Sequence, residues 1–327
     1  MPKRRTIAPD TRLAALRETI AAGTAPVEVL RTALADSNYR LVALAAGHAG
    51  DRLVYPLEAD LIAAFHRLAE LSHTQDPQCT AKGAIARALV ALDCADVTFF
   101  LTTLRYRQLE PTWGGSQDTA VDIRITAAMG LAATAYARAL PELTQLLIDP
   151  EPRVRAGVMD AIACCEPIAA ESVLRIKAQV GDAEPEVTGA CLLALLRLES
   201  EATAPFVGHF LDQRDPELRE VAALALGESR VPAALVELRT RWDAAPYKGA
   251  AEQILLKGAV LHRGDQAFDW LLSLVADGER RISERLIKDL AVYRGNQRLR
   301  RRLADALAGR GDADLVALLH RIWPKDS

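Results

Sequence analysis

Residues 149–165, DPEPRVRAGVMDAIACC, contain the pattern that decides the fold of this chain. From Val154 to Ile162, apolar or small residues fall at positions 0, +4, +7 and +8, which form one face of a helix with 3.6 residues per turn. Asp149 can accept backbone N–H groups at the helix start, and Pro150 lacks the N–H that a first turn would leave unpaired. The stretch therefore predicts an amphipathic helix that begins at its Asp-Pro pair.

The same spacing recurs along most of the chain. Each repeat has an apolar anchor followed by small or apolar residues at +4, +7 and +8, except that the last has Asp289 at +7. The last six anchors are 31 or 33 residues apart. A fixed period of this size is typical of stacked supersecondary units, so we expect the chain to grow by adding similar neighbours. The anchors are Ala81, Ile123, Val154, Val187, Leu218, Ala251 and Ile282.

A second apolar segment with helical spacing lies between consecutive anchors. Each repeat is therefore predicted to be two antiparallel helices joined by a short turn. One such pair cannot cover its own apolar faces, so the pairs must stack on each other. The predicted second helices lie at 96–104, 138–148, 169–180, 202–211, 232–242 and 267–275.

The composition agrees with a helical chain. Half of the 327 residues are hydrophobic and only 5% are aromatic, while the abundant Ala and Leu are strong helix formers. Few segments show the alternation that strands need, so we predict α-helix throughout. The basic N-terminus precedes an ordinary amphipathic segment, and no apolar run approaches the ~18 residues of a membrane span. We therefore expect a cytoplasmic protein that makes no membrane contact.

These repeats resemble HEAT repeats, in particular the short bacterial form that also occurs in phycobilisome-lyase-type proteins. The resemblance rests on the pattern D-P-x-x-x-V-R-x-x-A, on the helix pairs and on the period. It implies an all-α, right-handed α-solenoid of the armadillo-like helical class, with the second helices lining a concave face. It implies binding and no particular reaction. The matching residues are Asp149, Pro150, Val154 and Arg155; Asp215, Pro216, Leu218, Arg219 and Ala222; and, in part, Asp118, Ile123 and Arg124.

We expect three parts along the chain. Residues 1–75 form an N-terminal helical cap with degenerate repeats, residues 76–295 the HEAT-like array, and residues 296–327 a C-terminal helical cap. Terminal repeats need a solvent-compatible outer face, which explains their departure from the pattern. A basic residue follows the anchor in only some repeats. Where it is present, we expect a structural Asp–Arg network between neighbouring turns.

An insertion at residues 105–120 supplies the first candidate binding site, because the first interval between anchors is 42 residues. A solenoid accommodates extra residues where they project from its turns, and such loops often bind. Trp113 is followed by two glycines, which permit a tight turn, and Trp and Arg are favoured interface anchors. In the alternative, Trp113 fills a gap between repeats and the charges pair with each other. The candidate residues are Trp113, Arg105, Arg107, Glu110, Asp118, Asp122 and Arg124.

The second candidate site is a basic segment near the C-terminus. Residues 278–310 contain ten Arg and Lys residues against four acidic ones, a charge of +6 in a chain whose net charge is −3. On helices, two triplets would each share a face and form a patch for nucleic acid or an acidic protein. The alternative is a solvated capping face. The triplets are Arg281, Arg285 and Lys288, and Arg298, Arg301 and Arg302.

The sequence contains no recognisable catalytic motif. It has no HExxH, paired CxxC, GxSxG or P-loop pattern. Its five cysteines have no metal-knuckle spacing and suit small core residues in a reducing compartment. We therefore expect no metal, no cofactor and a non-enzymatic protein, although an active site assembled from distant repeats would leave no local motif.

Three functions fit this pattern. The favoured one is a protein–protein interaction scaffold that uses the concave face and the Trp113 loop, with another protein as partner. An alternative is a HEAT-like nucleic-acid-binding protein, including the base-excision type, in which Trp113 would act with Asp118 or Asp122; the acidic balance and the broken Arg column disfavour it. A lyase-type or cofactor-handling subunit would draw attention to Cys164 and Cys165.

Overall fold

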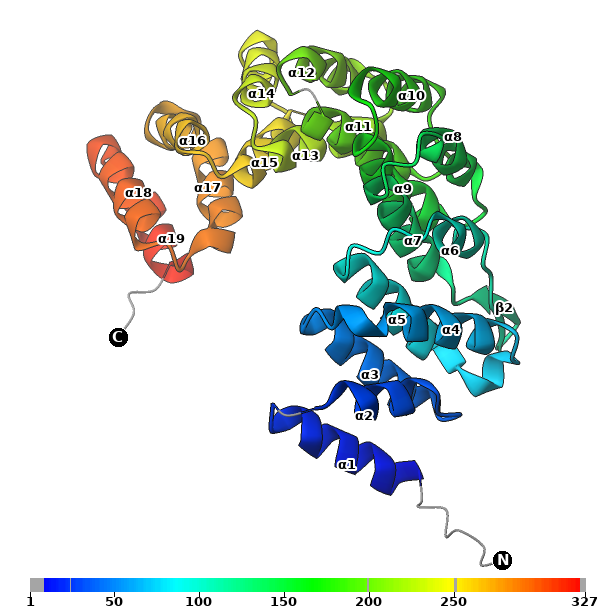
Figure 1. Cartoon of the computed structure of the whole chain (residues 1–327). Coiled ribbons are helices and arrows are strands. Elements are labelled where there is room, and N and C mark those ends of the chain that lie inside the picture. The colour runs from blue at the N-terminus through cyan, green and yellow to red at the C-terminus, as the bar shows by residue number, and fades with distance from the viewer. Residues whose placement is uncertain (1–8, 24, 199, 250–251, 324–327) are drawn as a thin grey trace, which may run out of the picture. The chain divides into compact units, whose positions relative to one another are not determined.

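The structure is a computed structural model that describes residues 9–23, 25–198, 200–249 and 252–323. In these ranges the chain forms nineteen α-helices, short 3-10 turns and one two-stranded hairpin. Antiparallel helix pairs follow one another as a repeat array (Figure 1). The fold is therefore an all-α, HEAT-like helical solenoid, as the repeat period predicted. It divides into two compact units, Met1–Ala170 and Glu171–Ser327.

In the first unit, α3 packs against α5, α5 against α7, and α7 against α9, so the anchor-bearing helices form one row. The elements are α1 (Pro9–Ala21), α2 (Val27–Leu34), α3 (Tyr39–Asp51), η1 (Tyr55–Leu57), α4 (Glu58–Ala69), η2 (His73–Gln75), η3 (Pro77–Cys79), α5 (Thr80–Ala91), α6 (Val97–Thr103), β1 (Leu109–Thr112), β2 (Gly115–Asp118), α7 (Val121–Ala133), α8 (Ala139–Thr144), η4 (Gln145–Ile148) and α9 (Pro152–Ala163). The unit boundary falls within α10 (Pro167–Val180).

The second unit has the same two-row plan. Helices α11, α13 and α15 pack side by side in one row, while α12 packs on α14 and α16 on α18 in the other. The elements are α11 (Pro185–Leu198), α12 (Ser200–Gly208), η5 (His209–Asp212), α13 (Pro216–Ser229), α14 (Pro232–Ala244), α15 (Gln253–His262), α16 (Asp265–Asp277), α17 (Arg280–Asp289), η6 (Leu290–Tyr293), α18 (Gln297–Arg310) and α19 (Ala313–Ile322).

The core of each unit follows the repeat pattern. Five of the anchors are at most 4% exposed, whereas Leu218 is half-buried and Ala251 lies outside the described residues. Burial of these apolar faces between neighbours is the main source of stability in such an array. The +4, +7 and +8 residues of three repeats are likewise buried: Val158, Ala161, Ile162, Cys191, Ala194, Leu195, Ala222, Ala225 and Leu226.

The predicted helix start at the Asp149-Pro150 pair is wrong, because the helix begins two residues after Pro150. Helix α9 begins at Pro152, and Glu151 before it has an extended backbone (φ −83°, ψ 115°). The ring of a proline disfavours a helical conformation in the residue before it, so Pro152 prevents an earlier start. Asp149 instead accepts the backbone N–H of Glu151 at 2.9 Å. Helix α13, by contrast, starts at Pro216 as predicted.

The insertion forms a β-hairpin, which corrects the expectation of helix throughout. Strands β1 and β2 pair antiparallel, with Leu109 opposite Asp118 and Thr112 opposite Gly115. Trp113 and Gly114 connect them, and Gly114 has a φ of +95°, which glycine adopts at low cost. The strands could not be predicted from the sequence, because each has only four residues and neither shows a clear alternation of apolar and polar side chains.

The predicted part boundaries at 75/76 and 295/296 rest on repeat quality and stay a prediction. Across the described ranges, each helix is too short or too polar to cross a membrane.

Candidate functional site

A buried ionic network ties the base of the hairpin to the helices behind it. Arg124 of α7 is 1% exposed, and its Nη1 donates to Asp118 Oδ2 at 2.7 Å and to the Tyr106 carbonyl at 3.0 Å. Its Nη2 donates to Asp149 Oδ1 of the next repeat at 3.3 Å. This arrangement confirms the predicted structural Asp–Arg network, since one guanidinium links two successive turns.

The preceding repeat has the same device with a lysine. Lys82 Nζ lies 3.0 Å from Asp76 Oδ2, and both side chains are at most 1% exposed. Asp76 also accepts the backbone N–H groups of Ala81 at 2.8 Å and Lys82 at 3.1 Å, which caps α5. A buried charge is tolerated when it is paired. Lys82 Nζ is paired with Asp76, but it makes no hydrogen bond of good geometry.

Glu110 of β1 fixes the other side of the hairpin base. Its Oε1 accepts hydrogen bonds from the Gln78 backbone N–H at 2.6 Å, Gln108 Nε2 at 2.8 Å and Thr119 Oγ1 at 2.8 Å. Burial acts to raise the pKa of Glu110, but hydrogen bonds from Gln108, Thr119 and Gln78 outweigh it and lower the pKa. The carboxylate is therefore ionised at neutral pH.

The segment that Glu110 contacts has an unusual backbone. Gln78 and Cys79 are consecutive non-glycine residues with positive φ, +58° and +52°. Such conformations are costly and persist only where surrounding contacts enforce them. Here Glu110 binds the Gln78 N–H, and Cys79 Sγ lies 3.4 Å from Thr119 Oγ1. The hairpin base is thus held at several points at once.

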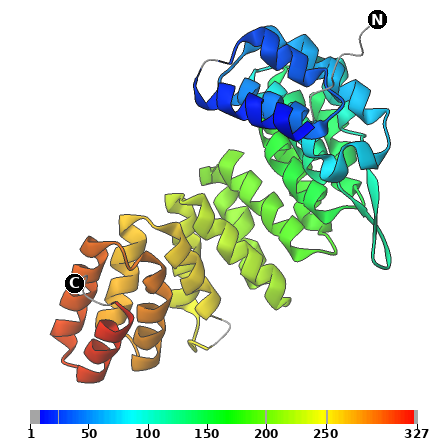
Figure 2. The ribbon, with the colours of Figure 1, turned by 90° about the horizontal axis from the view of Figure 1, so that it is seen from below.

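The tip of the hairpin is open to solvent. Residues 111–117 are all exposed, and the relative exposure of Trp113 is 106%. The hairpin stands clear of the helices of its own unit (Figure 2). Trp113 therefore does not fill a gap between the repeats of its own unit. The other half of that alternative, charges that pair with each other, holds for Asp118 and Arg124.

The other predicted residues of this site separate into two groups. Glu110, Asp118 and Arg124 belong to the buried base and hold the hairpin in place. The remaining three charges lie on the surface, and each is already in an ion pair. The pairs are Arg105–Glu142 at 2.7 Å, Arg107–Asp149 at 3.1 Å and Arg153–Asp122 at 2.8 Å. Of the seven predicted residues, Trp113 alone is exposed and not engaged in an ion pair, as expected of a residue that contacts a partner.

Several residues that hold the base of the hairpin could not be predicted from the sequence. Gln78, Gln108 and Thr119 were not singled out. Neutral polar residues carry no charge pattern or motif, and some of their partners are far away along the chain: Gln78 and Glu110 are 32 positions apart, as are Gln108 and Asp76.

The two basic triplets near the C-terminus lie on different helices. Arg281, Arg285 and Lys288 are exposed on α17, whereas the second triplet is on α18, which packs on α16. Carboxylates of α16 already neutralise part of that second triplet. Arg302 forms an ion pair with Asp269, and Arg298 lies 3.9 Å from Asp265, while Arg301 is exposed.

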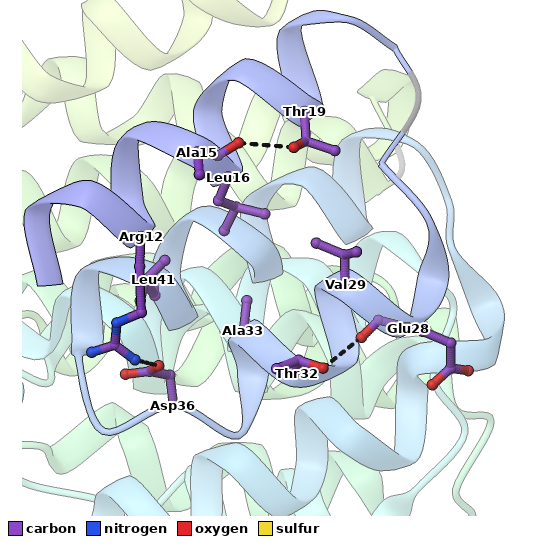
Figure 3. A pocket seen from close by; sticks show the side chains of 10 residues that line it. All are labelled: Arg12, Ala15, Leu16, Thr19, Glu28, Val29, Thr32, Ala33, Asp36 and Leu41. Atoms are coloured by element: carbon purple, nitrogen blue, oxygen red, sulfur yellow. Dashed lines mark hydrogen bonds and ion pairs between the residues drawn. The ribbon is translucent and has the colours of Figure 1, made fainter. Parts of the chain in front are cut away.

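An apolar hollow of about 410 Å³ lies near the N-terminal end, among α1, α2 and α3 (Figure 3). Leu16, Val29 and Leu41 line it. Most of its polar groups are satisfied within the fold: Arg12 pairs with Asp36, and the threonine hydroxyls at its rim donate to backbone carbonyls. Arg12 Nε is buried and has no hydrogen-bond partner, so the hollow combines apolar surface with one unsatisfied donor.

The cysteines do not form a reactive centre. Burial raises the pKa of Cys79 to about 11 and that of Cys191 to about 12, so both thiols are protonated at neutral pH. Cys164 is exposed and Cys165 half-buried, and burial raises the pKa of Cys165 as well. In the described ranges, no three His, Cys, Asp or Glu side chains are grouped to hold a metal ion.

Comparison with known proteins finds similarity only to solved structures of low sequence identity. No protein-family model matches the chain, and no curated protein matches its sequence. The complex of CpcE and CpcF of phycocyanin lyase from Nostoc sp. PCC7120 is 22% identical, with a TM-score of 0.44 over 74% of this chain and 91% of that chain. YibA of Escherichia coli is 14% identical, with a TM-score of 0.43 over 89% and 99%. Human deoxyhypusine hydroxylase in complex with glycerol is 16% identical, with a TM-score of 0.30 over 88% and 100%.

Proposed function

We propose that this chain is a non-enzymatic scaffold for protein–protein interaction, and that Trp113 is its principal contact residue. The observation that supports the proposal is a fully exposed tryptophan at the tip of a hairpin whose base is fixed by buried charges. A solvated indole has no packing role in its own fold. Trp is also the residue type most enriched among the dominant contacts of protein interfaces.

The rigid base makes the exposed tip suitable for binding. A flexible loop loses conformational entropy when a partner orders it, whereas a preorganised loop avoids most of that loss. Insertion of an indole into a partner's pocket buries about 200 Å², which contributes on the order of 5 kcal/mol before the costs of association. The exposed faces of the helix rows would supply the surrounding surface.

The base-excision alternative gains no support from the geometry. It needs a carboxylate free to act beside Trp113. Asp118 is buried in its ion pair with Arg124, and Asp122 pairs with Arg153. We therefore retain the protein-binding role, with another protein as the partner.

The proposal is tested by co-purification from the native cell with Trp113→Ala. A partner retained by the unmodified chain should be lost or reduced at least about tenfold with this variant, as expected for removal of a dominant interface residue. Tyr247→Ala is the matched control, because Tyr247 is also an exposed aromatic residue, 71% exposed, but lies in the second unit. Equal recovery of every partner with both variants would remove the Trp113 tip from the function.

Tryptophan fluorescence provides a direct second readout. The other three tryptophans, Trp242, Trp270 and Trp323, are at most 5% exposed. Quenching by iodide in solution should therefore report on Trp113, and bound partner should protect it. A partner that binds without reducing the quenching engages another surface.

A further inference from the structure

The exposed side of α13, α15 and α17 contains a groove outside the Trp113 site. Its larger part is a hollow of about 710 Å³ beside α15 and α17, and a second hollow of about 440 Å³ continues it toward α13. The two hollows share Lys257 and Arg285. The three helices lie in succession in one row of the second unit (Figure 1). We call the larger hollow the α15–α17 groove; its main lining residues are Lys257, Leu261, Arg263, Arg285, Lys288 and Val292.

Two of the four cations in the α15–α17 groove are neutralised within the fold. Lys257 Nζ lies 2.9 Å from Glu220 Oε1, and Arg285 Nε lies 2.7 Å from Asp289 Oδ2. The groove therefore has carboxylates opposite only half of its basic side chains.

The other two cations have no such partner. Among the residues that the structure describes, no carboxylate lies within ion-pair distance of Arg263 or Lys288. Arg263 Nε donates to the neutral hydroxyl of Tyr293 at 3.1 Å. The groove thus has an excess of two positive charges, and it attracts an acidic ligand.

The floor of the groove is apolar. Leu224 and Leu261 are half-buried there, and Val292 at the edge is 74% exposed. An exposed aliphatic side chain next to unpaired cations offers burial to an apolar group of the ligand as well as charge. The ligand should therefore combine carboxylates with at least one apolar side chain.

The same surface is poorly suited to nucleic acid. Glu217 and Glu220 lie at the α13 end and Asp289 lies inside, so a continuous chain of phosphates would meet negative charge along its path. The single aromatic residue of the groove is also engaged. The Tyr293 hydroxyl donates to the Val260 carbonyl at 2.8 Å and its ring packs edge-on against Phe268, which leaves it fixed and not free to stack on a base.

We propose that the α15–α17 groove binds an acidic peptide segment of a partner protein, with its carboxylates on Arg263 and Lys288 and an apolar side chain against Leu261 and Val292. This site is independent of Trp113. It gives the second unit a recognition surface of its own, selective for negatively charged, partly apolar sequences.

Fluorescence anisotropy of the full chain tests the proposal with a short fluorescein-labelled peptide built from Glu, Gly and Leu. We expect saturable binding that weakens as salt is added, because the charges at the edge of the groove are screened. A peptide with Lys in place of Glu should not bind. A peptide with Gly in place of Leu should bind more weakly, because it loses the contact with the apolar floor.

Charge reversal locates the site. Lys288→Glu should lower the affinity for the Glu-Leu peptide by about tenfold or more, as reversal of an interfacial charge does. Arg301→Glu is the matched control, since it makes the same change in charge at an exposed position on α18, and it should leave the affinity unchanged. Both positions are exposed, so neither change disturbs the core. Trp113→Ala should also leave the affinity unchanged, which separates this proposal from the function proposed above.

Several outcomes would overturn the inference. It fails if the Glu-Leu peptide shows no saturable binding, or if Lys288→Glu and Arg301→Glu weaken it equally. Tighter binding of a short DNA duplex that displaces the peptide would assign the groove to nucleic acid. Full displacement of the peptide by an equal concentration of tripolyphosphate would show that the α15–α17 groove is a general anion site.

Discussion

Arg124 is a charged side chain with almost no exposed surface, and it is the residue on which the hairpin base depends. Its guanidinium donates to Asp118 before α7, to the Tyr106 carbonyl before β1, and to Asp149 before α9. Backbone N–H groups also donate to both carboxylates, and Arg107 pairs with Asp149, but Arg124 is the buried cation that joins the two. Such a network specifies one arrangement of its segments, since any other leaves an uncompensated charge.

Replacement of Arg124 by Met should therefore destabilise the first unit strongly. We expect a loss of about 3–5 kcal/mol in the free energy of unfolding, because Asp118 then remains buried without a cation and Asp149 keeps only Arg107. Chemical denaturation of the full chain, followed by circular dichroism, measures it. Arg153→Met is the control: its pair with Asp122 is exposed on both sides (72% and 65%), and its loss should cost less than about 1 kcal/mol. Similar losses for the two variants would show that the buried network has no special role.

At the scale of elements, α13 and α15 approach each other closely enough to require glycine at two positions. A Cβ atom at Gly258 would lie 2.4 Å from the Ala223 carbonyl oxygen, and one at Gly227 would lie 2.2 Å from the Gly258 carbonyl oxygen. The obstacle in both cases is backbone, which cannot rotate away. Glycine lowers helix propensity, but here it permits the contact that stacks two repeats.

Gly258→Ala should accordingly separate the two helices and destabilise the second unit by about 1–3 kcal/mol, as overpacking of a close contact does. Thermal unfolding and denaturant titration measure the effect. Gly309→Ala in α18 is the matched control, because no atom lies within 4 Å of its added Cβ. That change should be neutral or stabilising by up to about 1 kcal/mol, since alanine is the better helix former. A neutral Gly258→Ala would mean that the helices can separate without loss.

At the scale of the whole molecule, the chain consists of two units, and within each unit the helix pairs pack on their neighbours. Stability in such an array is close to a sum of repeat and interface contributions. In the second unit, Trp323 after α19 is 1% exposed, and its Nε1 donates to the Ile287 carbonyl of α17 at 3.1 Å. This hydrogen bond adds to the packing of α19 on α17.

Deletion of residues 297–327 should loosen the array locally. Amide exchange in α16 and α17 should accelerate by about tenfold or more, because their covered faces become exposed. Exchange in α5 and α7 should not change, since each repeat depends on its neighbours only. Hydrogen–deuterium exchange of the shortened and full chains gives the comparison. A uniform rise along the chain would contradict the nearest-neighbour description.

The helical array could be predicted from particular spacings. The series from Val154 to Ile162 places four core residues on one helix face, and its recurrence locates the same faces in other repeats. The start of α9 was missed because Pro152 acts on the residue before it. The hairpin was missed because its strands are stabilised by contacts with distant segments and not by their own sequence.

The candidate site was predicted only in outline. Trp113 and its glycines indicated a projecting turn, but seven residues were treated as one surface when Glu110, Asp118 and Arg124 are buried beneath it. On α17, the basic spacing was visible in the sequence, whereas its apolar floor from α13 and α15 was not. Charge composition does not reveal which charges are already paired.

The sequence by itself determined the helices, their order and the faces they bury, because apolar periodicity acts within a helix and between adjacent pairs. Tertiary structure alone decided which polar groups are consumed by the fold and which remain available to a partner. Arg124 reaches Asp149, and Glu110 reaches Gln78, only after the chain between them has folded. Hydrogen bonds and ion pairs depend on distances of a few ångströms between residues far apart in the chain, and no local pattern encodes such distances.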